Sequence, residues 1–196
     1  SITPLHAVIV PIYKKENEEK VMKETESIKS KIESMGLKSE IDSSEKTPGE
    51  KFNIWELKGV PFRIEIGEKE IKEKKLTLFT RDTGKKEKIK ISEINKLKEL
   101  GKKYEDRIFK KADDFLNGKI IDCKSKHEII DAVKKGKIAR ANFCSVEKEG
   151  EKCAEVIEKE IGAEVRGTLA DKKEKTSGKC SVCGKDAKAV VYIGKS

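Results

Sequence analysis

The sequence contains no run of 18 apolar residues, and it does not open with a basic segment followed by an apolar one. We therefore expect no membrane span and no secretory signal, which favours a cytoplasmic location. Neither a P-loop nor a Gly-x-Gly-x-x-Gly motif is present. The only histidines, His6 and His127, lie far apart and have no nucleophile at a diagnostic spacing. We predict no catalytic residue within this chain.

Charged residues, by contrast, are abundant and unbalanced. They make up 41% of the 196 residues, with 45 Lys plus Arg against 36 Asp plus Glu, so the formal net charge is +9. Hydrophobic residues make up 35% and recur in regular periods, which indicates a folded protein with a highly charged surface rather than a disordered chain. The positive charge favours an anionic partner, and nucleic acid is the most plausible one.

The first half of the sequence alternates strand and helix patterns, followed by a hairpin. The predicted strands are 6–13, 37–42, 61–67, 76–82 and 87–91; the predicted helices are 16–35, 51–58 and 92–116, with a turn at 47–49. In the strand Pro61–Gly67, Arg63 and Glu65 alternate with apolar residues, which predicts one apolar and one charged face. This order predicts a mixed α/β domain.

After Asn117-Gly118 the pattern restarts as a smaller α/β domain. Its predicted strands are 120–123, 138–144, 164–169 and 189–193, and its predicted helices are 126–134 and 152–161. We therefore predict a first domain over residues 1–100, a connecting helix over 101–118 and a second domain over 119–196.

Five cysteines in a chain without an export signal favour metal binding or free thiols over disulfides. Cys180-Ser181-Val182-Cys183-Gly184 has the spacing of a zinc knuckle, and Cys144 and Cys153 flank a polar loop that can bring them together. We predict that Cys144, Cys153, Cys180 and Cys183 hold one structural zinc ion. Two alternatives remain: a redox Cys-x-x-Cys, and free buried thiols at 144 and 153. Cys123 ends an apolar strand and is expected to be an ordinary core thiol.

The stretch TPGEKFNIWELKGVPFRIEIG, residues 47–67, resembles the anticodon-binding domain of prolyl-tRNA synthetases of the archaeal and eukaryotic type. Pro-Gly, Lys-Phe, Trp-Glu, Gly-x-Pro and Arg-Ile-Glu-Ile-Gly recur there in this order. Members of this family also carry a C-terminal domain with a four-cysteine zinc site that ends in Cys-x-x-Cys-Gly. The resemblance extends over essentially the whole chain.

The resemblance implies that the first domain is a mixed five-stranded sheet with flanking helices, in agreement with the five predicted strands. It also implies that this domain binds the anticodon of the tRNA for proline, whose last two positions are guanines. The family's contacts map onto Glu56, Arg63 and Glu70, where the family has an Asp one methylene shorter at the last position. A fourth contact maps onto Lys85 or Lys86, and we take Lys86. Arginine can fork onto guanine O6 and N7, and a carboxylate can accept from guanine N1–H and N2–H₂. From the residues alone, Glu56 and Arg63 could equally be surface charges.

The resemblance further implies that the whole enzyme is a homodimeric ligase that joins proline to its tRNA with ATP and Mg²⁺. Its catalytic domain has no counterpart here, so we expect a C-terminal portion that is inactive alone. A freestanding RNA-binding module and a zinc-stabilised interaction domain are the alternatives. The segment 68–90 holds nine basic and five acidic residues, which favours a surface that faces phosphates.

Overall fold

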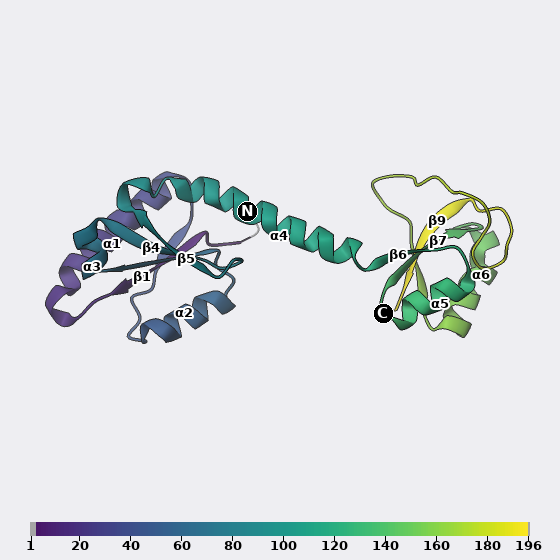
Figure 1. Cartoon of the computed structure of the whole chain (residues 1–196), viewed down its shortest axis with the longest axis horizontal. Coiled ribbons are helices and arrows are strands. Elements are labelled where there is room, and N and C mark those ends of the chain that lie inside the picture. Colours follow the sequence, from purple (N-terminus) through teal and green to yellow (C-terminus); the bar gives the residue numbers. More distant parts are fainter. Residues whose placement is uncertain (1–2, 196) are drawn as a thin grey trace. The chain divides into compact units, whose positions relative to one another are not determined.

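The computed structural model describes residues 3–195 (Figure 1). The chain forms two compact units whose boundary lies between residues 110 and 111. Each unit has its own sheet and its own hydrophobic core. No helix among the described residues is both long and apolar enough to cross a membrane.

The first unit contains a five-stranded mixed sheet of order β2-β1-β3-β4-β5. Its strands are β1 (Ala7–Ile12), β2 (Ser39–Ile41), β3 (Phe62–Gly67), β4 (Lys75–Thr80) and β5 (Lys85–Lys90). Strand β1 runs parallel to β2 and β3, whereas β3, β4 and β5 are antiparallel neighbours. The predicted mixed five-stranded sheet is confirmed.

The helices of this unit are α1 (Glu18–Ser34), α2 (Pro48–Leu57), α3 (Glu68–Glu73) and α4 (Lys96–Asn117), with 3₁₀ turns at Lys15–Asn17 and Ile91–Glu93. Buried residues of α1 and α4 pack with Phe62, Ile64 and Ile66 of β3 on one face of the sheet. On the other face, Trp55 of α2 packs on Val8 and Val10 of β1. In Figure 1, α2 accordingly lies on the side of the sheet opposite to α1.

Two local predictions for this unit were wrong, and one helix was missed. Residues 47–49 are not a separate turn: Thr47 is the N-cap of α2 and Pro48 is its first residue, so this helix begins earlier than predicted. Helix α3 was not predicted. The charged face of β3 does not face solvent, because all six residues of this strand are buried. A central strand that carries helices on both faces buries its polar residues as well.

The second unit contains a four-stranded sheet of order β6-β7-β9-β8. Its strands are β6 (Ile120–Cys123), β7 (Ile138–Phe143), β8 (Glu164–Gly167) and β9 (Ala189–Gly194). Its helices are α5 (Lys126–Lys134) and α6 (Glu151–Val156), with a 3₁₀ turn at Lys148–Gly150 and a π-helical turn at Ile157–Ile161 that continues α6. Both helices contribute to one core, in which Phe143, Ile129 and Ile157 are almost fully buried. The predicted smaller α/β domain is confirmed in architecture.

Candidate functional site

The charged residues of β3 lie on the sheet face that α2 partly covers. Because side chains alternate along a strand, Arg63 and Glu65 share a face opposite to Ile64. Arg63 is in register with Val8 of β1 on one side and Phe79 of β4 on the other, and Phe79 is in register with Lys86 of β5. This row leads from an apolar region beneath α2 to a basic outer strand.

A continuous set of ion pairs connects α2 to β5 across this face. Arg63 Nη1 lies 2.7 Å from Glu56 Oε1, and Arg63 Nε and Nη2 each lie 3.1 Å from Glu65 Oε1. Lys86 Nζ lies 2.8 Å from Glu65 Oε1 and 3.2 Å from Glu65 Oε2. The structure therefore joins three of the predicted anticodon contacts through a fourth residue, Glu65, that we did not predict.

Two aromatic rings enclose the guanidinium of Arg63. Its Cζ lies 3.8 Å from the ring centroid of Phe52 and 4.2 Å from that of Phe79. With these rings and two carboxylates around it, the Arg63 side chain is only 4% exposed. In this conformation Arg63 donates to Glu56 and Glu65, so direct forking onto a guanine stays a prediction. The charged groups that reach solvent are Glu56 and Lys86, whose side chains are 45% and 48% exposed.

The remaining predicted contact, Glu70, lies on α3 and is half-buried. Its Oε1 is 3.9 Å from Nζ of Lys88, which lies two residues from Lys86 and thus on the same face of the sheet. Lys85 is in register with Thr80, so it points to the opposite face from Lys86. The geometry thus favours Lys86 over Lys85, although the alternation along β5 was not used to choose between them from the sequence.

A buried polar cluster anchors α2, the helix that carries Glu56. Trp55 Nε1 donates to Asp42 Oδ2 at 2.6 Å, and the buried Lys51 Nζ donates to the Asp42 backbone carbonyl at 3.0 Å. The Ser44 backbone N–H and hydroxyl also donate to Asp42. Burial raises the pKa of Asp42, but the hydrogen bonds from Ser44 and Trp55 and the charge of Lys51 outweigh it, so the pKa lies below its ordinary value.

The second candidate site is a cluster of four cysteines. The sulfur atoms of Cys144, Cys153, Cys180 and Cys183 all lie within 4.8 Å of one another, and those of Cys144 and Cys153 are 3.6 Å apart. Four sulfurs that bind one zinc ion tetrahedrally at about 2.3 Å are about 3.8 Å from each other. The cluster therefore has the donor set and the dimensions of a four-cysteine zinc site.

A tight loop brings the first two cysteines together. Cys144 directly follows β7, the chain turns through Lys148–Gly150, and Cys153 lies on the first turn of α6. Gly150 is buried, and a Cβ there would lie 1.9 Å from the backbone oxygen of Ser145. Only glycine fits this approach, so the loop that pairs Cys144 with Cys153 depends on it.

The other two cysteines lie on a knuckle. The backbone N–H of Cys180 donates to the Lys185 carbonyl at 2.7 Å, and that of Gly184 donates to the Cys180 carbonyl at 3.0 Å. Gly184, at the turn after Cys183, has φ +74°, a left-handed conformation that glycine adopts without strain. The backbone N–H of Lys185 lowers the pKa of Cys183 to about 7, whereas burial raises the pKa of Cys153.

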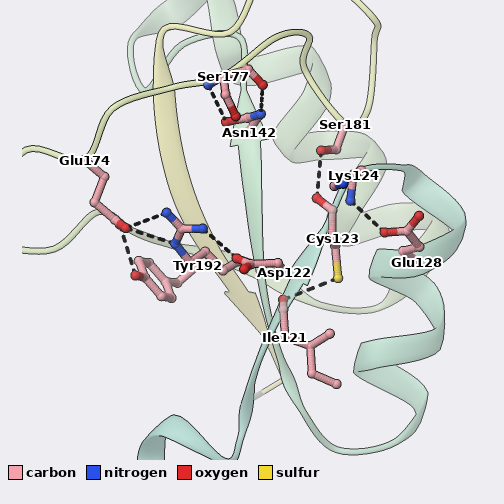
Figure 2. Close-up of polar contacts among 11 residues, drawn as sticks. Ile121, Asp122, Cys123, Lys124, Glu128, Asn142, Glu174, Ser177, Ser181 and Tyr192 are labelled. Carbon is pink, nitrogen blue, oxygen red and sulfur yellow. Dashed lines mark hydrogen bonds and ion pairs between the residues drawn. The ribbon is translucent and has the colours of Figure 1, made fainter.

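Side chains of β7 hold the long segment that precedes the knuckle, as Figure 2 shows. Arg140 donates to Glu174. Glu174 also accepts from the hydroxyl of Tyr192 at 3.0 Å (Figure 2). The Asn142 side-chain amide donates to the backbone carbonyl of Ser177. These contacts fix the approach to Cys180 at two points before the chain enters the cluster.

Cys123 lies outside the cluster. Its thiol donates to the Ile121 carbonyl at 3.5 Å, and burial raises its pKa to about 11 (Figure 2). Its side chain belongs to the core of the second unit. The expectation of an ordinary core thiol agrees with this environment.

Family models match a large part of each of the two units. The family model described as "Anticodon binding domain" matches residues 6–100, and the one described as "Prolyl-tRNA synthetase, C-terminal" matches residues 126–196. The proline--tRNA ligase of Thermofilum pendens is 36% identical over 200 residues, which cover 100% of this chain and 41% of that protein. That of Nanoarchaeum equitans is 36% identical and covers 100% of this chain and 35% of that protein.

A solved structure also matches almost the whole chain. The prolyl-tRNA synthetase of Giardia lamblia, solved in complex with prolyl-adenylate, matches 98% of this chain and 43% of its own chain. The TM-score is 0.87 and the sequence identity is 32%. The chain thus spans less than half the length of these relatives.

Proposed function

This chain belongs to the prolyl-tRNA synthetase family, and from that premise we propose that it binds the anticodon of the tRNA for proline through Glu56, Arg63, Glu70 and Lys86. The domain that does this is residues 1–100, followed by the connecting helix 101–118 and the zinc domain 119–196. The observation that carries the proposal is the set of ion pairs among Glu56, Arg63, Glu65 and Lys86, called here the charged network. It lies on the face of β3, within the segment that matches the anticodon-binding model.

The exposed groups of this network complement a guanine. The Watson–Crick edge of guanine presents the acceptor O6 beside the donors N1–H and N2–H₂, and an unpaired anticodon base leaves this edge free. The Glu56 carboxylate accepts from the donors, and the Lys86 ammonium donates to O6. Arg63 donates to the Glu56 carboxylate at 2.7 Å and so orients it. The net +4 charge of residues 68–90 supports phosphate contacts beside the bases.

The test is binding of anticodon stem-loop RNAs to the wild-type chain and to Glu56→Ala. We expect the wild type to prefer the two cognate guanines over adenines at these positions. Glu56→Ala should cost about 1–3 kcal/mol of that preference, since one guanine edge then lacks its acceptor. The matched control is Glu99→Ala, which removes an exposed carboxylate that pairs with Lys103 on α4. Equal binding of all RNAs by the wild type would overturn the proposal.

For the four-cysteine cluster we propose a structural zinc ion. Four thiolates fill a tetrahedral site, so no position remains for substrate or water. The ion would cross-link the loop after β7 to the knuckle before β9. The pairing of three buried cysteines with one exposed cysteine supports this role, because such a site is closed toward the core and reachable from the surface.

For the whole enzyme we propose the reaction that the name of its relatives gives, the ligation of proline to its tRNA. From the family resemblance we further propose that this reaction uses ATP and that the enzyme is a cytoplasmic homodimer. ATP and Mg²⁺ would bind to the catalytic part and not to these residues. The alternative, a freestanding RNA-binding module, is less well supported, because the relatives are more than twice as long as the matched region. The sequence encoded upstream of Ser1 discriminates between the two.

A further inference from the structure

Glu65 is the one member of the charged network that is bonded to two cations and has no assigned contact with RNA. It is buried, with 9% of its surface exposed, in the middle of β3. Its carboxylate accepts from Arg63 at 3.1 Å and from Lys86 at 2.8 and 3.2 Å. A carboxylate in this position is costly to bury unless both cations stay in place.

The first consequence concerns Lys86. A lysine on an edge strand ordinarily samples many rotamers, and holding it in one of them costs side-chain entropy. Here both oxygens of Glu65 hold its ammonium, which also lies 4.9 Å from the ring centroid of Phe52. An ammonium has three N–H donors, so one of them remains for a ligand. The entropy is therefore lost on folding rather than on binding.

The second consequence concerns Glu56. Its carboxylate is fixed by Arg63, and Arg63 is fixed in turn by Glu65 and by the rings of Phe52 and Phe79. Glu65 thus connects the exposed acceptor of the site to its exposed donor. Their separation is set by a buried group and not by two independent surface side chains.

We propose that Glu65 is a positioning residue for guanine recognition: it holds Lys86, and through Arg63 also Glu56, in the arrangement that matches a guanine edge. This inference rests on the proposed function. It predicts that Glu65 governs the choice between guanine and adenine more than the overall affinity for RNA.

The competing explanation is that Glu65 only neutralises the buried charge of Arg63. Both explanations predict some loss of stability in Glu65→Gln, so stability does not separate them. The two explanations differ in whether the effect of the Glu65 substitution on base discrimination depends on Lys86. If Glu65 acts partly by holding Lys86, removing the Lys86 ammonium should weaken the effect of the Glu65 substitution on base discrimination and leave only the part that acts through Arg63 on Glu56.

The experiment is a double-mutant cycle with Glu65→Gln, Lys86→Met and the double variant, and with Glu99→Gln as the control of equal charge change. The measured quantity is the ratio of Kd for stem-loops with adenine and with guanine at each of the two positions. We expect Glu65→Gln to lower this ratio about tenfold at one position. In the Lys86→Met background it should change the ratio by about threefold or less, because only the contact through Arg63 to Glu56 is then left to be lost.

The overall affinity of Glu65→Gln for RNA gives an independent test. Removing a negative charge makes the face more basic, so a purely electrostatic role predicts tighter binding of all RNAs by one common factor. Thermal unfolding reports whether Glu65→Gln is folded. If it is not, Glu65→Asp retains the charge but is one methylene too short to hold both cations, and it should show the same loss of discrimination.

The outcomes are distinct. A wild-type chain that discriminates, together with a Glu65→Gln variant that keeps the full ratio, would overturn this inference and leave the proposed function standing. An equal loss of ratio with and without Lys86 would also overturn it. A wild-type chain that does not discriminate would overturn the proposed function and this inference together.

Discussion

Asp42 holds α2 against the sheet, and replacing it by Ala should destabilise the first unit strongly. The substitution removes the carboxylate that accepts from the Trp55 indole at 2.6 Å and from Ser44. It also removes the negative charge 4.0 Å from Nζ of Lys51, a side chain that is only 6% exposed. Lys51 keeps the Asp42 backbone carbonyl at 3.0 Å, because that acceptor does not depend on the side chain.

The expected loss follows from these contacts. Breaking a buried ion pair by removing one partner typically costs about 3–5 kcal/mol, since the other charge stays buried without compensation. The retained carbonyl contact places the loss at the lower end, at about 3 kcal/mol. A domain of this size has a free energy of unfolding of about 5–15 kcal/mol, so this is a large fraction of the total.

Urea unfolding, followed by the fluorescence of the single tryptophan, measures the effect, since Trp55 is itself part of the cluster. The control is Glu33→Ala, which removes an exposed i,i+4 ion pair with Lys29 and should cost about 0.5 kcal/mol or less. Equal losses in the two variants, or a loss below about 1 kcal/mol for Asp42→Ala, would refute the reasoning.

The pH dependence of the free energy of unfolding, compared between the wild type and Asp42→Ala, gives a second test. The pKa of Asp42 is lower in the folded chain than its ordinary value of 3.8. The contribution of its ionised form is therefore present above about pH 4 and is lost as the pH falls through the folded pKa. The wild type should lose more unfolding free energy than Asp42→Ala between pH 6 and pH 3, and parallel curves would contradict this assignment.

Four further predictions follow from the two units. We expect one zinc ion per chain by metal analysis and less than half an equivalent in Cys180→Ser. The second unit of this variant should unfold while the first remains folded. Full zinc content in this variant would exclude Cys180 as a ligand. Pyrophosphate exchange on this chain alone should show no dependence on proline. Cys123, with a pKa of about 11, should be alkylated at pH 8 at least about a hundredfold more slowly than a free cysteine, and a comparable rate would contradict its burial. Lys85→Ala removes a lysine from the face of β5 opposite to Lys86 and should leave the ratio of Kd for adenine and guanine stem-loops unchanged, whereas a loss restricted to cognate RNA would contradict the choice of Lys86 over Lys85.

The sequence was sufficient for the main elements because their periodicity is strong. The alternation in β3 and the helical spacing of Val21, Ile28 and Ile32 predicted a strand and a helix, and the structure has both. The proximity of the two cysteine pairs was also predicted, from a knuckle motif and a connecting loop. That these cysteines bind zinc stays a prediction.

Other features depend on the tertiary structure and left no periodic signal. Helix α3 has a single apolar residue, Ile71, among five charged ones, so neither a strand nor a helix pattern is visible. The burial of Arg63 and Glu65 arises because β3 lies in the centre of the sheet beneath α2, and alternation alone describes an edge strand equally well. The roles of Phe52 and Phe79 follow only from the position of the Arg63 guanidinium between them.

The position of β5 at the edge of its sheet has a consequence for solubility. An edge strand exposes unpaired backbone groups to which a strand of another copy can add, and charged side chains, lysine above all, prevent this. Four of the six residues of β5 are lysines, and all of its residues except Ile89 are exposed. Lys86, which is proposed to contact RNA, is thus also one of the lysines that keep this edge from aggregating. Variants that neutralise several of them should lose RNA affinity and colloidal stability together.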